Sequence, residues 1–253
     1  MKIAVLVKQT PQLSEVAATE NGVQWSDSAL IISPFDEYAV EEALRIRERV
    51  GGTAVAITYG KATAESALRD VLALGTDDAF LIEADDFSAT DPQSSARVLA
   101  AAIKKIGDIN LVLTGKQATD DDSALVAAAV AAHLEWPQIG FVKKFDKIEN
   151  GKIVAWRTTD VGYDIVESSL PAVCSVVKEI NEPRLPSLKG KMKAKKAEIR
   201  RLTISELGVD LSSPITVKSV LPPKPRPAGE MLIGEADQAI DKLIEKLKSD
   251  QFI

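Results

Sequence analysis

The sequence predicts an α/β fold, with a mostly parallel, doubly wound sheet and helices on both faces. Short apolar runs alternate with segments of helical periodicity from residue 2 to about residue 134, which is the pattern of βαβ units with right-handed crossovers. Hydrophobic residues make up 45% of the chain and aromatic residues only 5%, as expected for buried strands rich in alanine, valine, leucine and isoleucine. Beyond residue 136 the runs become shorter and are separated by turns, which indicates a short antiparallel section.

The first half of the chain predicts four strands and four helices. The strands are expected at residues 2–8, 53–58, 79–82 and 110–114, and the helices at residues 34–50, 62–74, 91–106 and 120–134. In the first helix, Glu41 pairs with Arg45 on the polar side, opposite an apolar stripe. That stripe consists of Ala39, Val40, Ala43, Leu44, Arg47 and Val50. Gly75 closes the second helix, and Asp91 with Pro92 begins the third.

The second half predicts shorter strands that lead back to the main sheet. Antiparallel strands are expected at residues 141–145, 154–159 and 165–169, with turns at Glu149–Gly151 and Val161–Gly162. Leu170–Val177 is almost wholly apolar, as expected for a strand of the main sheet. Residues 1–205 are therefore expected to form one flavodoxin-like, nucleotide-binding type of domain.

Residues 206–253 predict an extended C-terminal arm. Four prolines, Pro222, Pro223, Pro225 and Pro227, indicate a stiff linker. Residues 236–248 predict an amphipathic helix with an apolar side made of Ile240, Leu243, Ile244 and Leu247. The arm is either a disordered tail with a nascent helix or an element that packs on a partner. The apolar stripe favours the partner, because an isolated helix of this length is marginal in water.

Composition excludes several classes of protein. The net charge of −6 argues against nucleic-acid binding. The single cysteine, Cys174, lies in an apolar run, so we expect a buried thiol, no internal disulfide and a reducing compartment. The apolar run at residues 2–8 is too short for a signal peptide, and no stretch of about 18 apolar residues occurs. We therefore expect a soluble, bacterial-type cytoplasmic protein without direct membrane insertion.

No catalytic constellation is evident. The only histidine, His133, has no serine, cysteine or carboxylate arranged near it in sequence, so a structural or surface role is expected. One histidine and one cysteine argue against a zinc site. The chain contains neither a G-x-x-x-x-G-K-[ST] loop nor a G-x-G-x-x-G fingerprint. The sequence therefore predicts no enzyme with its own acid, base or nucleophile.

The best candidate for a binding site is the edge of the sheet where the strands end. Ligands of open α/β sheets bind at the point where the strand order reverses. The loops at residues 7–11, 59–61 and 115–123 could meet there, joined by residues 33–36. Asp120–Asp122 either cap the helix that follows, or hold a ribose or a neighbouring loop while helix amides face a phosphate.

Residues 181–196 predict a docking element. This segment contains two prolines and a glycine and shows no helical or strand period, although it follows a buried strand. Leu185 and Leu188 are flanked by lysines and have little core to enter, so another protein is their expected partner. The basic run Lys189–Lys196 is either a solvated face or a surface that steers an acidic partner.

These motifs together resemble the β (small) subunit of electron transfer flavoproteins. The resemblance covers residue 1 to about residue 210 in the right order. It rests on Val7-Lys8, Ser33–Glu37 with Ala39–Leu44, Gly115–Ala118 with Asp120–Asp122, Trp136–Gln138, Asn181–Arg184 and Met192–Lys196.

The resemblance implies an electron carrier rather than an enzyme. It implies a heterodimer with a larger α subunit, which mainly holds the single FAD. Electrons would come from acyl-CoA dehydrogenases of fatty acid oxidation, or from other flavin dehydrogenases, and pass to a membrane quinone oxidoreductase. The recognition leucine of the family corresponds to Leu188.

The resemblance also implies a structural AMP site, from which this sequence departs. The matching positions are Leu6, Ser33, Pro34, Phe35, Asp36, Tyr59, Gly115, Lys116, Gln117, Ala118, Thr119, Asp120, Asp121, Asp122, Ser123, Ala124, Leu125 and Val126. The family usually has polar residues where this chain has Ala124, Leu125 and Val126, and a small residue at Tyr59. We therefore expect AMP to be bound weakly or not at all, and no second, bifurcating FAD in this subunit.

Two other functions remain open. A stand-alone nucleotide-binding regulator would have the same sheet, but the leucine segment and the C-terminal arm would have no role in it. A nucleotide-dependent enzyme would need an acid, base or nucleophile that the sequence does not supply. Expression of the chain alone separates these possibilities. An obligate subunit should aggregate or expose apolar surface, and it should bind FAD only when it is co-expressed with its α partner.

Overall fold

The computed structural model describes residues 1–19, 22–84, 91–211, 215, 218–219, 221, 224 and 228–253. The chain divides into two compact units, Met1–Val220 and Leu221–Ile253. The expected proline linker falls on Pro222, Pro223, Pro225 and Pro227, which lie outside the described residues. The expected division at residues 205 and 206 stays a prediction.

The first unit contains the predicted strands and helices in the predicted order, together with further elements that were not predicted. Its strands are β1 (Lys2–Leu6), β2 (Gln9–Pro11), β3 (Ala17–Thr19), β4 (Gly22–Gln24), β5 (Leu30–Ile32), β6 (Thr53–Gly60), β7 (Asp78–Glu83), β8 (Leu111–Gly115), β9 (Gln138–Glu149), β10 (Lys152–Thr159), β11 (Gly162–Ser169), β12 (Ala172–Val176) and β13 (Arg200–Leu202). Its helices are α1 (Pro34–Val50), α2 (Glu65–Leu74), α3 (Pro92–Ile106), α4 (Val126–Leu134), α5 (Leu188–Lys196) and α6 (Ile204–Leu207).

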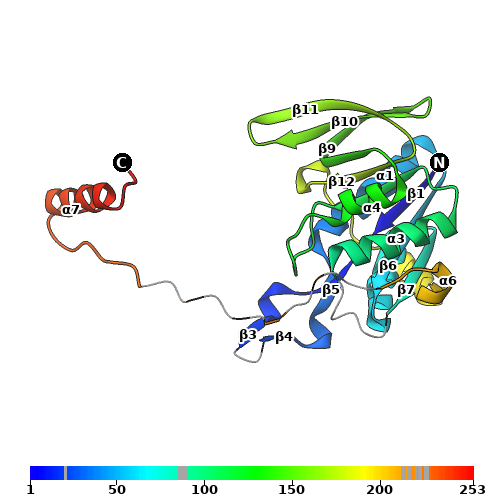
Figure 1. Cartoon of the computed structure of the whole chain (residues 1–253), viewed down its shortest axis with the longest axis horizontal. Helices are drawn as coiled ribbons and strands as arrows, with labels where there is room; N and C mark the ends of the chain where they lie inside the picture. Colours follow the sequence, from blue (N-terminus) through cyan, green and yellow to red (C-terminus); the bar gives the residue numbers. More distant parts are fainter. Residues whose placement is uncertain are drawn as a thin grey trace. The chain divides into compact units, whose positions relative to one another are not determined.

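One large sheet organises this unit, in the strand order β11-β10-β9-β12-β8-β1-β6-β7-β13 (Figure 1). β1 pairs in parallel with both β6 and β8, with Ala4 opposite Val55 on one side and Val112 on the other. The chain first builds the sheet from β1 toward β7 and then returns to add β8 beside β1. The strand order therefore reverses between β1 and β8, which confirms a doubly wound α/β fold.

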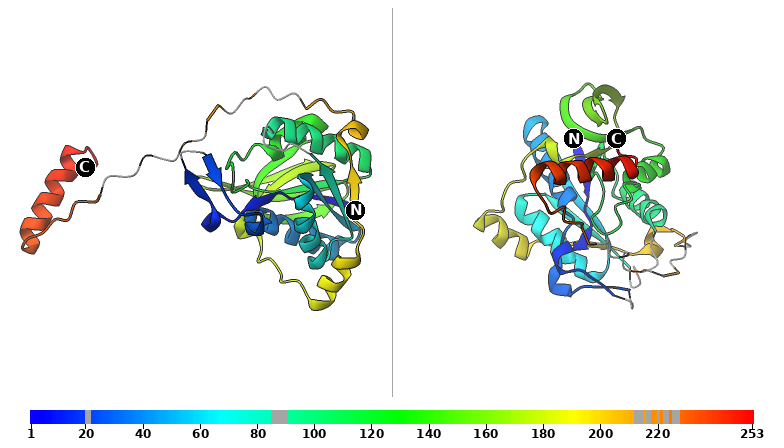
Figure 2. Two further views of the ribbon diagram at one scale, coloured as in Figure 1. Left: turned by 90° about the horizontal axis from the view of Figure 1, so that it is seen from below. Right: turned by 90° about the vertical axis from the view of Figure 1, so that its left-hand side faces the viewer.

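Helices cover both faces of the sheet (Figure 2). Side chains of β1 alternate between two apolar clusters, because successive residues of a strand point to opposite faces. Ile3 and Val5 pack in the cluster of α1 and α2, whereas Ala4 and Leu6 pack in the cluster of α3 and α4. Both clusters consist mainly of aliphatic side chains, as the composition predicts.

The antiparallel section belongs to the same sheet rather than to a separate one. β9 pairs in parallel with β12 near Gln138–Val142 and antiparallel with β10 over most of its length. The predicted strand at residues 141–145 was therefore too short. Three further features were not predicted: β13 beside β7, the pair β2–β5, and the pair β3–β4.

The apolar stripe of α1 was predicted only in part. Ala39, Val40, Ala43 and Leu44 are fully buried, but Val50 is 40% exposed and Arg47 is not buried. Glu41, expected on the polar side, is only 3% exposed. The reason is that α1 is covered on that side by residues 181–184, whose sequence gave no sign of this packing.

Cys174 lies in the middle of β12 and is fully buried. Burial raises the pKa of its thiol to about 12, although a backbone hydrogen bond with Ile139 acts in the opposite direction. The expected buried cysteine is thus confirmed. Within the described residues, no helix combines the length and apolar character needed to cross a membrane. The cytoplasmic location stays a prediction.

The second unit contains the helix α7 (Ala236–Ser249). None of its residues is buried, and Ile240, Leu243 and Ile244 are 53%, 46% and 39% exposed. The predicted amphipathic helix is therefore present, and its apolar side is left open within this unit.

Candidate functional site

A pocket lies where β1, β6 and β8 end, at the reversal of the strand order. Its walls also include the first turns of α3 and α4. It is lined by Leu6, Val7, Lys8, Asp36, Tyr59, Pro92, Ser95, Leu99, Thr114, Gly115, Lys116, Gln117, Ala118, Asp121, Ser123, Ala124, Leu125, Val126 and Ala127. Its volume is about 100 Å³, below the range of about 300–1,000 Å³ typical of small-molecule sites.

Asp36 joins the ends of the two strands that flank the reversal. It lies in the first turn of α1, and its Oδ2 accepts from the backbone N–H of Lys8 at 2.8 Å. Its Oδ1 accepts from the backbone N–H of Gly115 at 3.0 Å. Burial raises the pKa of Asp36 to about 7, although these two hydrogen bonds act in the opposite direction. A single carboxyl group therefore holds the loop after β1 against the loop after β8.

Gly115 permits this close approach. A Cβ at this position would lie 2.6 Å from Asp36 Oδ1 and 2.6 Å from the backbone carbon of Phe35. Any larger residue would push the end of β8 away from the start of α1. The glycine is therefore required by the tight contact between backbone segments, not by an unusual dihedral angle.

The loop from Lys116 to Leu125 differs from the prediction. The helix expected from Asp120 begins at Val126, because Asp122 and Ala124 have φ values of 53° and interrupt the helical path. The capping role proposed for Asp120–Asp122 is therefore wrong, since α4 has no acidic residue in its first turn and no side-chain cap.

Two of these aspartates pair with Lys8 instead. Lys8 Nζ lies 2.7 Å from Asp120 and 3.5 Å from Asp121, which links the loops after β1 and β8 a second time. Gln117 donates to Asp122 in the same loop. This is one of the two alternatives left open by the sequence, in which a carboxylate holds a neighbouring loop.

The structure gathers most of the predicted site residues, but not all of them. Twelve line the pocket: Leu6, Asp36, Tyr59, Gly115, Lys116, Gln117, Ala118, Asp121, Ser123, Ala124, Leu125 and Val126. Ser33, Pro34, Phe35, Thr119, Asp120 and Asp122 are not among the lining residues. The Oγ of Ser33 is buried and has no hydrogen-bond partner.

The contribution of α3 to the pocket was not predicted. Pro92, Ser95 and Leu99 line the pocket from this helix. Asp91 caps it, since its Oδ1 accepts from the N–H groups of Gln93 at 2.7 Å and Ser94 at 3.0 Å. The signal was available, because a helix that follows a parallel strand begins at the edge where ligands bind.

The lining of this pocket contains groups that suit a phosphate and groups that do not. Free backbone amides at the start of α4, at Val126 and Ala127, are suitable for a phosphate. However, Ala124, Leu125 and Val126 offer it no polar side chain, and the acidic residue Asp121 also lines the pocket. Lys8 is already paired with two aspartates.

The docking segment, residues 181–196, is not structureless as predicted. From Leu188 to Lys196 it forms α5, whose N-cap Ser187 accepts a hydrogen bond from the N–H of Gly190 at 3.0 Å. This helix was not predicted from its lysine-rich sequence. Only Ala194 of its nine residues is buried, so the sequence has no apolar stripe. Leu185, Leu188 and Met192 are 91%, 78% and 61% exposed.

Helix α5 is fixed on α2 at both of its ends. A Cβ at Gly190 would lie 2.2 Å from the carbonyl oxygen of Ala73, so the two helices approach as closely as a glycine allows. At the other end, Arg69 Nη1 donates to the carbonyl oxygen of Ala194 at 2.8 Å, while Glu65 holds the guanidinium at 2.6 Å. The position of Leu188 therefore depends on α2.

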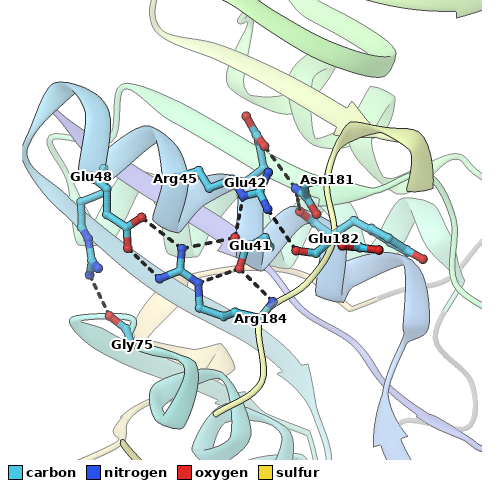
Figure 3. A network of polar contacts seen from close by, with 10 residues as sticks. Glu41, Glu42, Arg45, Glu48, Gly75, Asn181, Glu182 and Arg184 are labelled. Carbon is cyan, nitrogen blue, oxygen red and sulfur yellow. Dashed lines mark hydrogen bonds and ion pairs between the residues drawn. The ribbon is translucent and has the colours of Figure 1, made fainter. Parts of the chain in front are cut away.

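The other end of the segment is fixed on α1 by a network of polar contacts (Figure 3). Arg184 Nε and Nη2 donate to Glu41 at 2.7 and 3.2 Å, and Nη1 and Nη2 donate to Glu48 at 2.6 and 3.1 Å. The backbone N–H of Arg184 also donates to Glu41, at 3.2 Å.

Two neighbouring residues add to this network. Asn181 Nδ2 donates to the carbonyl oxygen of Tyr38 at 3.0 Å and to Glu42 at 3.1 Å. Arg45 Nη2 donates to the carbonyl oxygen of Glu182 at 3.1 Å. Three residues of the segment thus contact one side of α1.

The Glu41 carboxylate is the most buried charge of this network. Burial raises its pKa, but hydrogen bonds from Arg184 and Arg45 outweigh burial and hold the pKa below its ordinary value. Hydrogen bonds to Glu48 and Glu41 likewise raise the pKa of Arg184. Glu41 and Arg184 are therefore both charged at neutral pH.

No metal-binding arrangement of three or more histidine, cysteine or acidic side chains occurs within the described residues. His133 lies at the end of α4, where its carbonyl oxygen accepts from Lys104 Nζ at 2.9 Å and its ring contacts Gln93 at 3.2 Å. These contacts connect α4 to α3.

Comparison with known proteins gives a consistent result. The model of the electron transfer flavoprotein domain matches residues 24–207, which is more than half of the chain. An electron transfer flavoprotein subunit beta of Thermoanaerobacterium thermosaccharolyticum is 38% identical over the whole of both chains. The corresponding subunit of Bacillus subtilis is 36% identical over 99% of this chain and 98% of its own length. A caffeyl-CoA reductase-Etf complex subunit, CarD, of Acetobacterium woodii is 34% identical over the whole of both chains.

Proposed function

This chain belongs to the family of electron transfer flavoprotein beta subunits, and we propose that it forms one half of a heterodimeric electron carrier. The observation that carries this proposal is the similarity to beta subunits over the full length of both chains. The larger α subunit is the partner, and it holds most of the contacts to one FAD. The cofactor supplies the electron chemistry, while this chain positions the partners.

The docking segment is the proposed contact with the electron donor. The donor is an acyl-CoA dehydrogenase or another flavin dehydrogenase, and a quinone oxidoreductase is the acceptor. The name of the Acetobacterium relative joins an Etf to a reductase of a CoA compound. It therefore supports a partner enzyme that acts on a CoA compound, and the donor role of that enzyme belongs to our proposal. Leu188 supports it further, because an exposed apolar side chain ringed by polar residues is the expected form of an anchor.

Helix α7 is the proposed contact with the α subunit. Its apolar side is open within the second unit, and an isolated helix of this length is marginal in water. Packing against a partner would bury Ile240, Leu243 and Ile244 together.

The pocket at the strand ends has a structural role in this proposal, with weak or absent AMP. The small volume, the side chains of Ala124, Leu125 and Val126, and the Asp121 carboxylate all support weak binding. Losing two or three hydrogen bonds to a charged phosphate costs about 1.5–3 kcal/mol each.

Co-expression with the α subunit, followed by flavin and nucleotide analysis, tests these assignments. We expect one FAD for each heterodimer, AMP well below one equivalent, and no FAD on the chain alone. A stoichiometric AMP content would contradict the assignment of the pocket. A well-behaved isolated chain that binds nucleotide without a partner would instead favour a stand-alone regulator.

Substitution of Leu188 tests the donor contact. In the heterodimer, Leu188→Ala is expected to lower electron acceptance from an acyl-CoA dehydrogenase about thirtyfold, because a hot spot contributes about 2 kcal/mol. FAD content should not change. Val161→Ala is the matched control, since Val161 is 99% exposed on the turn between β10 and β11. Unchanged kinetics in Leu188→Ala, or loss of flavin, would contradict the docking assignment.

A further inference from the structure

The start of the docking segment depends on polar contacts for its geometry. Residues 181–187 form neither helix nor strand, and Leu185 is 91% exposed. Exposed leucines gain little apolar contact with their own domain, so they do not hold the backbone in place. The contacts that can do so are those of Asn181, Glu182 and Arg184 with α1.

Arg184 makes more hydrogen bonds to α1 than Asn181 or Glu182 does. It directly precedes Leu185 and stands four residues before Leu188. All three guanidinium nitrogens donate to carboxylates of α1, and its backbone N–H donates to one of them as well. Side chain and main chain are therefore fixed to the same helix at the same point.

Charge neutralisation of Glu41 does not explain this arrangement. Arg45 already pairs with Glu41 at 2.6 Å from within the same helix. The side chain of Arg184 is 34% exposed, so its guanidinium reaches the 4% exposed Glu41 carboxylate from the surface. The Arg184 guanidinium instead fixes the orientation of the segment, because a planar guanidinium fits two carboxylates in only one orientation.

The segment is thus held between two supports. Arg184 fixes its start on α1, and Gly190 with Arg69 fixes α5 on α2. Leu185 and Leu188 lie between these supports and face away from the core.

We propose that Arg184 is a positioning residue for docking of the electron donor. By fixing the start of the segment on α1, it holds Leu185 and Leu188 in one arrangement, so that the donor does not have to order them on binding. This inference rests on the proposed function and assigns a role to a residue that does not touch the flavin.

The conservative substitution Arg184→Lys tests this role. Lysine keeps the positive charge beside Glu41, but it cannot donate to Glu41 and Glu48 as a planar fork. In the FAD-loaded heterodimer, with a purified acyl-CoA dehydrogenase and its acyl-CoA substrate, we expect KM for the carrier to rise about tenfold, which is about 1.4 kcal/mol. The kcat should stay within about twofold, because positioning affects binding rather than the electron-transfer step.

A double-mutant cycle with Leu188→Ala separates positioning from a general structural effect. If Arg184 acts by presenting Leu188, then Arg184→Lys should have little further effect on KM in the Leu188→Ala background. Fully additive effects would overturn the proposal. Arg200→Lys is the matched control, since Arg200 makes an exposed ion pair with Asp78 at 3.0 Å and lies outside the segment.

Hydrogen exchange supplies a readout that does not depend on the donor. Amides of residues 185–191 should exchange faster in the Arg184→Lys heterodimer, while those of β1 and β8 stay protected. Unchanged exchange in the segment would overturn the positioning role, even if the kinetics changed. A wild-type carrier that the dehydrogenase cannot reduce would overturn the donor class, and the proposal with it. A defect in Leu188→Ala without any defect in Arg184→Lys would overturn the positioning role alone.

Discussion

The pocket at the strand ends and the docking segment both include irregular backbone, but different contacts hold that backbone in place. In the pocket, the buried Asp36 carboxyl accepts hydrogen bonds from two main-chain N–H groups, and Gly115 lets the backbones touch. In the docking segment, long side chains reach across the surface of α1 and α2. A substitution in the pocket should therefore lower the stability of the whole sheet, whereas a substitution in the docking segment should affect mainly that segment.

Substitution of glycine by alanine should affect stability differently in the two regions. Gly115→Ala should have the largest effect, because the new Cβ would lie 2.6 Å from both Asp36 Oδ1 and the Phe35 backbone. We expect the free energy of unfolding to fall by about 1–3 kcal/mol, as for overpacking in a core. Thermal unfolding of the heterodimer measures this loss.

Gly60→Ala is the matched control for Gly115→Ala. Gly60 ends β6, which lies on the other side of β1 from β8, and a Cβ there would meet only the Ala64 side chain at 3.4 Å. Equal losses in the two variants would show that the contact with Asp36 is not what makes Gly115 necessary.

Asp36→Asn tests how the stability of the pocket region depends on pH. An acid whose pKa is raised in the folded state stabilises the fold most below its ordinary pKa, and this contribution is lost as the pH rises through the raised value. The pKa of Asp36 is raised from 3.8 to about 7, so the stability of the wild type should fall between these values. Asparagine cannot ionise and can satisfy only one of the two N–H donors, so the variant should be about 1–3 kcal/mol less stable near pH 5.

The free energies of unfolding of the wild type and of Asp36→Asn should become more similar as the pH rises from 5 to 8. Thermal unfolding of the heterodimer across this range measures it. Asp146→Asn serves as a charge control, because Asp146 pairs with Lys144 on the surface at 3.0 Å. A difference that widens with pH would mean that hydrogen bonding outweighs burial at Asp36.

Gly190→Ala should have the smallest effect on global stability. Its Cβ would lie 2.2 Å from the carbonyl oxygen of Ala73, so α5 must move away from α2. Because the contact lies at the surface, we expect a loss below about 1 kcal/mol, but clearly weaker binding of the donor dehydrogenase. Equal weakening of the fold by Gly190→Ala and Gly115→Ala would remove the distinction between the two regions.

Much of the fold could be predicted because it follows from local pattern. The runs that became β1, β6, β7, β8 and β12 are apolar and short, and they alternate with helical periods. The pairing of β13 with β7 could not be predicted, since Arg200–Leu202 is short and half polar. The burial of Glu41 could not be predicted either, because it depends on Arg184, which lies 143 residues away in the sequence.

The candidate site could be predicted at the level of loops but not of side chains. The rule that ligands bind where strand order reverses located the ends of β1, β6 and β8. The residues that line the pocket depend on the path of the loop after β8, where Asp122 and Ala124 take positive φ values. Aspartates in sequence resemble a helix cap, so local pattern indicated a helix six residues too early.

The burial of Cys174 makes this chain convenient for site-specific spectroscopy. A thiol whose pKa is raised to about 12 forms little thiolate at neutral pH, and the thiolate is the species that alkylating reagents attack. A cysteine introduced at an exposed position of the docking segment would then be the only reactive one in the chain. A fluorophore attached there would report association with a partner, without first removing the native sulfur.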